Sequence, residues 1–185
     1  MHVLVTGGLG HIGAALIRHL AESRRVRAIT ILDNLLTQRY ASLFDLPKEG
    51  DYTFVEGDVL EPEDVARAMR GVDAVVHLAA ITNAENSFDI SEQVQAVNCG
   101  GTRNVVEACI QQGVQSLVFP STTSVYGPVS GIAREECDRS ELCPQSPYAT
   151  SKLAAEQEIL AASERGDING VVLRLGTIFG PSPGM

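Results

Sequence analysis

Short apolar runs alternate along the chain with longer segments of helical periodicity. Several of these runs are apolar at consecutive positions, which is typical of strands buried on both faces of a sheet. They predict strands at 2–6, 26–32, 52–57, 73–80, 116–121 and 170–175, and the segments between them predict helices at 11–23, 62–70, 91–112 and 147–165. The repeated strand–helix order predicts an α/β fold, a doubly wound parallel sheet with right-handed crossovers and helices on both faces.

The composition suits one globular domain of 185 residues, 44% hydrophobic and 20% charged, with a net charge of −9. No cluster of Lys and Arg marks a surface for nucleic acid. The four cysteines, Cys99, Cys109, Cys137 and Cys143, lack the spacing of a zinc site, so we expect no metal and free thiols. Because the sequence shows neither a secretion signal nor a run of about 18 apolar residues, we expect a cytoplasmic protein with no membrane partner.

The first predicted strand runs directly into TGGLGHIG, residues 6–13. Gly7, Gly10 and Gly13 have the spacing of a phosphate-binding turn: one glycine for the tight turn, one for close approach of a pyrophosphate and one for helix–sheet packing. The helix that follows offers its N-terminal N–H groups to the phosphates. Because the turn lies between a strand and a helix, it predicts a Rossmann-type dinucleotide-binding domain over residues 1–185.

Asp33 ends the second predicted strand, 20 residues after the last glycine of the turn. A carboxylate there can accept hydrogen bonds from both hydroxyls of an adenosine ribose and would repel a 2′-phosphate, which favours NAD over NADP even though Arg39 lies nearby in sequence. Asp58, after the third strand, could reach the adenine amino group. The small residues of HLAA, 77–80, would let a dinucleotide pass closely, and we expect His77 to be a packed strand residue.

The stretch SPYATSK, residues 146–152, predicts the start of a helix, with Ser146 as the N-cap and Pro147 at the first helical position. Tyr148 and Lys152 are four residues apart and therefore share a face. Lowering the pKa of a tyrosine from about 10 to near neutrality costs roughly 4 kcal/mol. An ammonium about 4 Å away supplies about that much at an effective dielectric constant of about 20. We therefore expect Lys152 to make Tyr148 acidic enough to act as a base.

Hydroxyl groups follow the fifth predicted strand in STTSVYG, residues 121–127. They should reach the same edge of the sheet as the tyrosine, because ligands of open parallel sheets gather at the carboxyl ends of the strands. Ser121, Thr122, Thr123 and Ser124 are all candidates for the partner hydroxyl, and the residues alone do not choose among them. With the glycine turn, this cluster and the tyrosine–lysine pair indicate proton transfer beside a nucleotide cofactor.

The order of these motifs resembles that of extended short-chain dehydrogenases/reductases, in particular the NAD-dependent epimerase/dehydratase family that acts on nucleotide sugars. The matching motifs run over essentially the whole chain: TGGLGHIG, LDN, GDV, HLAA, Asn98 with GGT and Asn104, STTSVYG and YATSK. Aligned on VYG, the resemblance identifies Thr122, Tyr148 and Lys152 as catalytic residues. It also implies NAD as cofactor, with contacts expected from Gly7, Gly10, His11, Ile12, Gly13, Asp33, Asn34, Asp58, Val59, Leu78, Ala79, Ala80, Asn98, Tyr148 and Lys152.

The resemblance implies the mechanism of a nucleotide-sugar 4-epimerase. Tyr148 takes a proton from a sugar hydroxyl while the carbon beneath gives hydride to NAD⁺. Thr122 hydrogen-bonds the same oxygen, and Lys152 holds the cofactor ribose. The ketone turns over and takes hydride back on its other face, which regenerates NAD⁺.

Several positions depart from the family pattern. Related 4,6-dehydratases carry an Asp-Glu pair directly after the catalytic threonine, where this chain has Thr123 and Ser124, and this disfavours dehydration. Thr177 stands where asparagine is usual, which weakens the assignment of a nucleotide sugar. The family continues into a smaller C-terminal substrate lobe, and from the end of this sequence at residue 185 we expect that lobe to be missing. Relatives pair through helices such as 91–112 and 147–165, so a homodimer is a further expectation.

Three functions stay open. The motifs favour an epimerase acting on a nucleotide sugar; the alternatives are a net dehydrogenase or reductase of another alcohol or ketone, and a non-catalytic NAD-binding regulatory protein. Cofactor use separates the first two, because a net redox enzyme consumes NAD⁺ or NADH whereas an epimerase retains it. Intact Thr122, Tyr148 and Lys152 count against the regulator, since a sensor needs no proton-transfer groups.

Overall fold

A computed structural model describes residues 1–129 and 131–181; position 130 and the last four residues of PSPGM lie outside the described residues. The strands are β1 (His2–Thr6), β2 (Ala28–Asp33), β3 (Tyr52–Glu56), β4 (Ala74–His77), β5 (Ser116–Thr122) and β6 (Asn169–Leu175). The α-helices are α1 (His11–Glu22), α2 (Pro62–Ala68), α3 (Ser91–Gln95), α4 (Gly101–Gln112) and α5 (Pro147–Glu164). The predicted elements are thus confirmed, and nearly all boundaries lie within two residues of those predicted.

The six strands form one parallel sheet in the order β3-β2-β1-β4-β5-β6. The chain moves outward from β1 through β2 and β3, and then crosses to β4 on the other side of β1. The neighbouring strands β1 and β4 therefore send their following loops to opposite sides, and this opens a crevice at their carboxyl ends. The predicted Rossmann-type sheet is confirmed, and its topology fixes where a ligand would lie.

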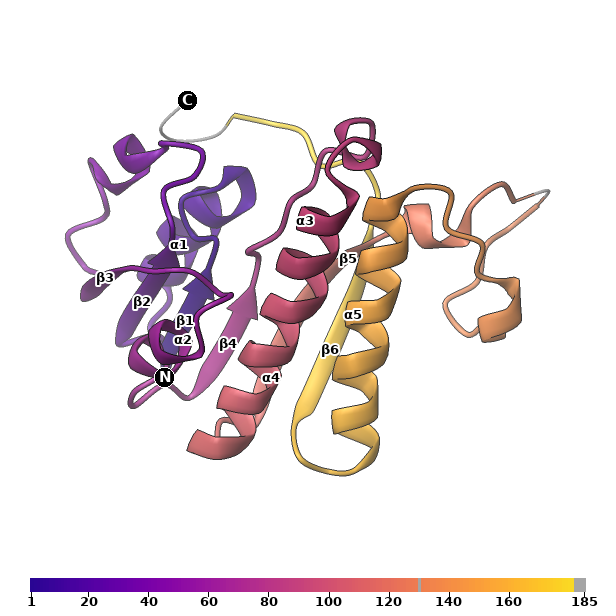
Figure 1. Ribbon diagram of the computed structural model, residues 1–185. Helices are drawn as coiled ribbons and strands as arrows, with labels where there is room; N and C mark the ends of the chain where they lie inside the picture. Colours follow the sequence, from indigo (N-terminus) through magenta and orange to yellow (C-terminus); the bar gives the residue numbers. More distant parts are fainter. Residues whose placement is uncertain (130, 182–185) are drawn as a thin grey trace.

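Helices cover both faces of the sheet, as predicted, but they cover them unequally (Figure 1). One face carries the larger core, in which α2, α4 and α5 pack against apolar residues of β1, β4 and β5, such as Leu4, Val75 and Leu117. On the opposite face, α1 packs through Ile17 and Ala21 onto β1 and β2. Both cores are built from consecutive apolar positions of the central strands, which send alternate side chains to the two faces.

The edge strand β6 is buried on one face: Val172 faces the core beneath α5, whereas Val171 is 49% and Leu173 is 41% exposed. One prediction about local structure was too simple. The predicted helix 91–112 is interrupted, because a π-helical turn at Ala96–Gly100 separates α3 from α4. Turns of this kind frequently occur at functional sites, and this one contains Asn98.

Candidate active site

The glycine turn joins β1 to α1 by close backbone packing. Gly7 has φ +63°, and a Cβ there would lie 2.6 Å from the backbone nitrogen of Ala79. A Cβ on Gly13 would lie 2.6 Å from the carbonyl oxygen of Gly8. Gly10 caps α1 without a side-chain hydrogen bond, and a helix N-terminus of this kind favours an anion. The sequence thus builds a helix N-terminus directly over the end of β1.

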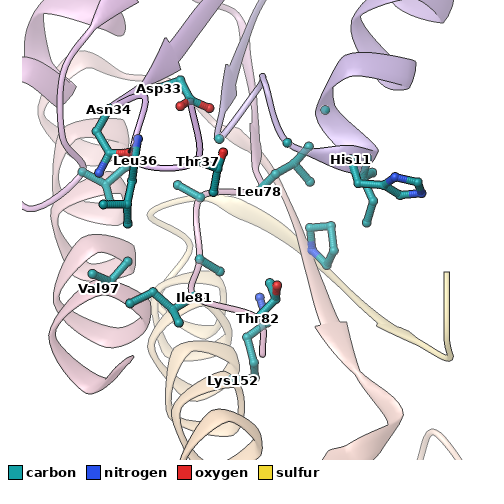
Figure 2. A pocket seen from close by; sticks show the side chains of 18 of the residues that line it. His11, Asp33, Asn34, Leu36, Thr37, Leu78, Ile81, Thr82, Val97 and Lys152 are labelled. Atoms are coloured by element: carbon teal, nitrogen blue, oxygen red, sulfur yellow. Dashed lines mark hydrogen bonds between the residues drawn. The ribbon is translucent and has the colours of Figure 1, made fainter. Parts of the chain in front are cut away.

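A cavity of about 510 Å³ lies at the carboxyl ends of the strands, beside this turn. The predicted site residues that line it are Gly7, Gly10, His11, Ile12, Gly13, Asp33, Asn34, Asp58, Val59, Leu78, Ala79, Ala80, Thr122, Tyr148 and Lys152. Asp33 and Asn34 lie at one end and Lys152 at the other (Figure 2). Ser121, one of the four candidate hydroxyls, also lines the cavity. Residues that the sequence patterns did not single out contribute as well, namely Leu36, Thr37, Ile81 and Thr82.

Hydrogen bonds from the backbone hold the Asp33 carboxylate in place at its end of the cavity. The carboxylate accepts hydrogen bonds from the backbone N–H groups of Leu9 and Leu35, both at 3.0 Å. Next to it, Asn34 donates to the carboxylate of Asp58 at 2.9 Å. A carboxylate offers about four lone-pair sites, so Asp33 keeps acceptor capacity for hydroxyls of a ligand.

Tyr148 and Thr122 meet at the other end, where α5 begins and β5 ends. Ser146 caps α5 by accepting from the N–H of Ala149 at 3.1 Å, and Pro147 occupies the first turn, as predicted. Tyr148 is half-buried. Burial raises the pKa of Tyr148, and a side-chain hydrogen bond with Thr122 partly opposes that rise. The structure therefore brings a phenol and a threonine hydroxyl together at the cavity wall.

Lys152 lines the cavity with Tyr148, as expected, but its side chain is deeply buried. Its side chain is 4% exposed, and its Nζ lies 4.0 Å from the centroid of the Phe119 ring. Burial lowers the pKa of Lys152 to about 7, although Glu156 and Cys99 act in the opposite direction. Burial and the Thr122 hydrogen bond account for the shifted pKa of Tyr148 in the ligand-free protein, and a lowering of that pKa by Lys152 stays a prediction.

The buried ammonium predicts a pH dependence of stability. The pKa of Lys152 is about 7 in the folded protein and about 10.4 in an unfolded chain. Between these values the unfolded chain binds more protons at this site, so the free energy of unfolding should rise from about pH 7 toward about pH 10. Urea unfolding across that range should show the wild type gaining stability relative to Lys152→Met. The exposed-site variant Lys48→Met should show the same pH dependence of the free energy of unfolding as the wild type. The prediction would be contradicted if the free energies of unfolding of Lys152→Met and the wild type changed in parallel with pH.

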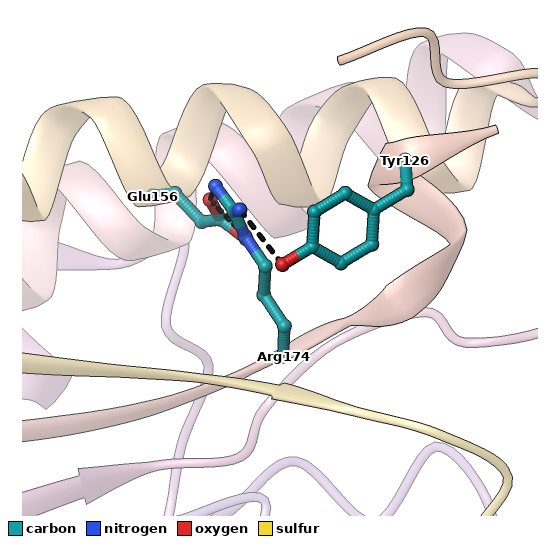
Figure 3. Close-up of polar contacts among 3 residues, drawn as sticks. All are labelled: Tyr126, Glu156 and Arg174. Atoms are coloured by element: carbon teal, nitrogen blue, oxygen red, sulfur yellow. Dashed lines mark hydrogen bonds and ion pairs between the residues drawn. The ribbon is translucent and has the colours of Figure 1, made fainter. Parts of the chain in front are cut away.

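An ion pair holds α5 against β6 one turn below Lys152. Glu156 is 1% exposed, and its carboxylate accepts from Nε and Nη2 of Arg174, the shortest contact being 2.8 Å (Figure 3). Arg174 Nη1 also donates to the Tyr126 hydroxyl at 3.1 Å. Neither charged residue was predicted as functional, although an arginine within the apolar run GVVLRL is a signal that it has a buried partner.

Two other polar residues stabilise the region without entering the cavity. His77 is fully buried, and its ring nitrogens contact the hydroxyls of Thr6 at 2.7 Å and Thr102 at 3.0 Å, as expected of a packed residue. Asn98, expected to contact the cofactor, is not among the residues that line the cavity. Its side chain instead binds the backbone N–H and carbonyl of Ile81 and the hydroxyl of Ser151. It therefore fixes the segment after β4 against the start of α5.

The described residues contain no group of His, Cys, Asp or Glu that could hold a metal ion. All four cysteines are free thiols. Within residues 1–129 and 131–181, the helices are too short or too polar to cross a bilayer. The side chains that line the described cavity carry hydroxyls, carboxylates, the Asn34 amide, the His11 imidazole, the Arg39 guanidinium and the Lys152 ammonium.

Comparison with known proteins gives a consistent result. The NAD dependent epimerase/dehydratase family matches residues 3–185. Uncharacterized UDP-glucose epimerase YtcB of Bacillus subtilis is 33% identical over 98% of this chain and 58% of that protein. The 2-alkyl-3-oxoalkanoate reductase of Stenotrophomonas maltophilia is 37% identical over 98% of this chain and 52% of that protein. The crystal structure of Thermus thermophilus UDP-glucose 4-epimerase with NAD has a TM-score of 0.85 at 36% identity, over 98% of this chain and 57% of the other. The chain thus spans about half the length of these relatives.

Proposed function

The chain belongs to the NAD-dependent epimerase/dehydratase family, and we propose that it binds NAD and acts as an epimerase on a nucleotide sugar. One observation carries the proposal. A phenol and a threonine hydroxyl, from Tyr148 and Thr122, share one end of a cavity with Lys152, while Asp33 occupies the other end. This is the set of groups that proton transfer beside a dinucleotide requires.

The size and the residues of the cavity fit NAD. The cavity volume of about 510 Å³ lies within the range of about 300–1,000 Å³ typical of cofactor sites. The N-terminus of α1, where Gly10 makes no side-chain capping hydrogen bond, suits a pyrophosphate. Asp33 suits the hydroxyls of an adenosine ribose, and Asn34 with Asp58 suits the adenine beside it. When bound, NAD⁺ supplies the hydride acceptor and a positive charge at the nicotinamide ring.

Residues of the chain transfer the proton and position the sugar oxygen. Tyr148 Oη takes the proton of a sugar hydroxyl and returns it when the ketone is reduced on its other face. Thr122 Oγ1 hydrogen-bonds the same oxygen and fixes its position. Lys152 Nζ would hold the cofactor ribose, and its positive charge would lower the pKa of the phenol. Because burial alone raises the pKa of Tyr148, positive charge near the phenol is needed for it to act as a base near neutrality.

Epimerisation is favoured over dehydration by the residues that follow Thr122. Thr123 and Ser124 cannot supply the acid and base that removal of water requires. The Thermus thermophilus relative, with a TM-score of 0.85, is a UDP-glucose 4-epimerase. Pairing of two copies through α4 and α5 is part of the same proposal, and light scattering of the purified protein tests it.

A second candidate is a net reductase or dehydrogenase of another ketone or alcohol. The 2-alkyl-3-oxoalkanoate reductase, at 37% identity, and Thr177 in place of the usual asparagine favour it.

One experiment separates the candidates. The protein from its complete reading frame should be incubated with UDP-, GDP- and dTDP-sugars and NAD⁺, while isomer formation and NADH absorbance are followed. Isomer formed without net NADH supports the epimerase. Stoichiometric NADH from any alcohol would establish the second candidate, and NAD binding without turnover would favour a regulator.

Asp33 should determine the choice between NAD and NADP. Replacing it with asparagine removes the charge and an acceptor, and hydrogen bonds to charged groups contribute about 1.5–3 kcal/mol. Asp33→Asn should therefore weaken NAD binding by roughly tenfold or more and reduce the preference for NAD over NADP. Calorimetric titration with both nucleotides measures this, with the exposed-site variant Asp51→Asn as control. An unchanged NAD:NADP affinity ratio in Asp33→Asn would refute the role of Asp33.

A further inference from the structure

Ser121 has a buried hydroxyl that nothing in the described protein binds. The residue lies at the carboxyl end of β5 and is 5% exposed. Its Oγ is the one buried side-chain nitrogen or oxygen, among the described residues, that has no hydrogen-bond partner. Other buried polar groups close by are paired, such as those of His77 and Ser151. The unpaired state is therefore specific to this position.

A hydroxyl buried without a partner costs free energy, since about 90% or more of buried polar groups are hydrogen-bonded and an unsatisfied one costs about 1–3 kcal/mol. An alanine at this strand position would avoid that cost. Ser121 is among the residues that line the cavity, and a change of its side-chain rotamer would present the buried hydroxyl to a molecule bound there. The position of the hydroxyl on the wall decides which part of that molecule it meets.

Ser121 belongs to the end of the cavity that holds the reacting groups. It directly precedes Thr122, and side chains two residues apart on a strand share a face, so Ser121 lies on the same face as Phe119. The Lys152 ammonium lies over that ring at 4.0 Å. Ser121 and Lys152 both line the cavity, and Lys152 lies at the end away from Asp33.

We propose that Ser121 Oγ hydrogen-bonds the nicotinamide riboside half of the dinucleotide and so contributes to NAD affinity. The inference rests on the proposed function, in which this cavity holds NAD. A hydroxyl can both donate and accept, which suits the ribose hydroxyls and the carboxamide that this half of the molecule carries. Ser121 is thus a binding residue for the cofactor, distinct from the proton-transfer role of Thr122 beside it.

Calorimetric titration of Ser121→Ala with NAD and with ADP tests the inference, because ADP lacks the nicotinamide riboside. NAD should bind about fivefold to tenfold more weakly to the variant, as expected for one lost hydrogen bond, while ADP affinity stays unchanged. The melting temperature of the ligand-free variant should be equal to or above that of the wild type, because no existing hydrogen bond is lost. Ser116→Ala, which removes an exposed hydroxyl at the opposite end of β5, should behave as the wild type throughout.

Wild-type affinity for NAD in Ser121→Ala would overturn this inference alone and would mean that water satisfies the hydroxyl. An equal loss of affinity for NAD and ADP would also overturn it, because the change would then act on the whole site. Failure of the wild type to bind NAD would overturn both this inference and the proposed function. A loss confined to NAD, with melting unchanged, supports it.

Discussion

Replacing Tyr148 with phenylalanine is expected to lower kcat by about 10²–10⁴-fold, the usual contribution of a general acid–base group, while NAD binds with nearly wild-type affinity. The variant removes one oxygen and keeps the ring, so the half-buried packing at the start of α5 is retained. At 25 °C the loss corresponds to about 3–5 kcal/mol of transition-state stabilisation. Steady-state kinetics on the nucleotide sugar that the substrate panel identifies measures the effect.

The matched control for this experiment is Tyr40→Phe, since Tyr40 is 58% exposed and is not among the residues that line the cavity. That variant should retain wild-type kcat and NAD affinity. Calorimetry with NAD separates a loss of chemistry from a loss of cofactor. A Tyr148→Phe enzyme with full activity would refute the assignment of the phenol, and one that no longer binds NAD would show a structural role for the hydroxyl instead.

The second large effect is expected at the ion pair between α5 and β6. Arg174→Met leaves the Glu156 carboxylate, 1% exposed, without its partner. Breaking a buried pair in this way costs about 3–5 kcal/mol. The free energy of unfolding measured in urea should fall by that amount, because the uncompensated charge must either stay buried or take up a proton.

The double variant Arg174→Met/Glu156→Leu should recover most of the lost stability, because replacing both partners by apolar groups is often neutral. Arg165→Met is the control: its pair with Asp167 is exposed, with side chains 58% and 33% accessible, and exposed pairs contribute about 0–1 kcal/mol. If Arg174→Met costs no more than Arg165→Met, the buried pair does not stabilise the contact of α5 with β6.

The sheet could be predicted from the sequence because apolar runs and glycine turns are local signals. The order of strands and helices follows from them, as does the cavity at the carboxyl ends of β1 and β4. The ends of the strands are harder to predict where the chain leaves the sheet. The apolar run 73–80 continues past His77, but residues 78–80 line the cavity instead of extending β4. Apolar character alone does not distinguish a strand from a segment that packs against a glycine turn.

The electrostatics of the site could not be predicted in the same way. The spacing of Tyr148 and Lys152 shows that they share a helix face, but it does not reveal that the ammonium packs on Phe119, a residue of β5. The same holds for Arg174 and Ser121, whose roles depend on what surrounds them in the fold. A residue's type and spacing predict which groups meet, whereas burial and pairing arise from contacts between distant segments.

A crystal structure of the protein with NAD tests the central claim most directly, namely that one cavity joins a dinucleotide cradle to a proton-transfer pair. The account predicts the pyrophosphate at the N-terminus of α1, the adenosine ribose on Asp33, and the nicotinamide end beside Tyr148 and Lys152. A dinucleotide bound outside this cavity, or bound with its adenine next to Tyr148, would contradict it.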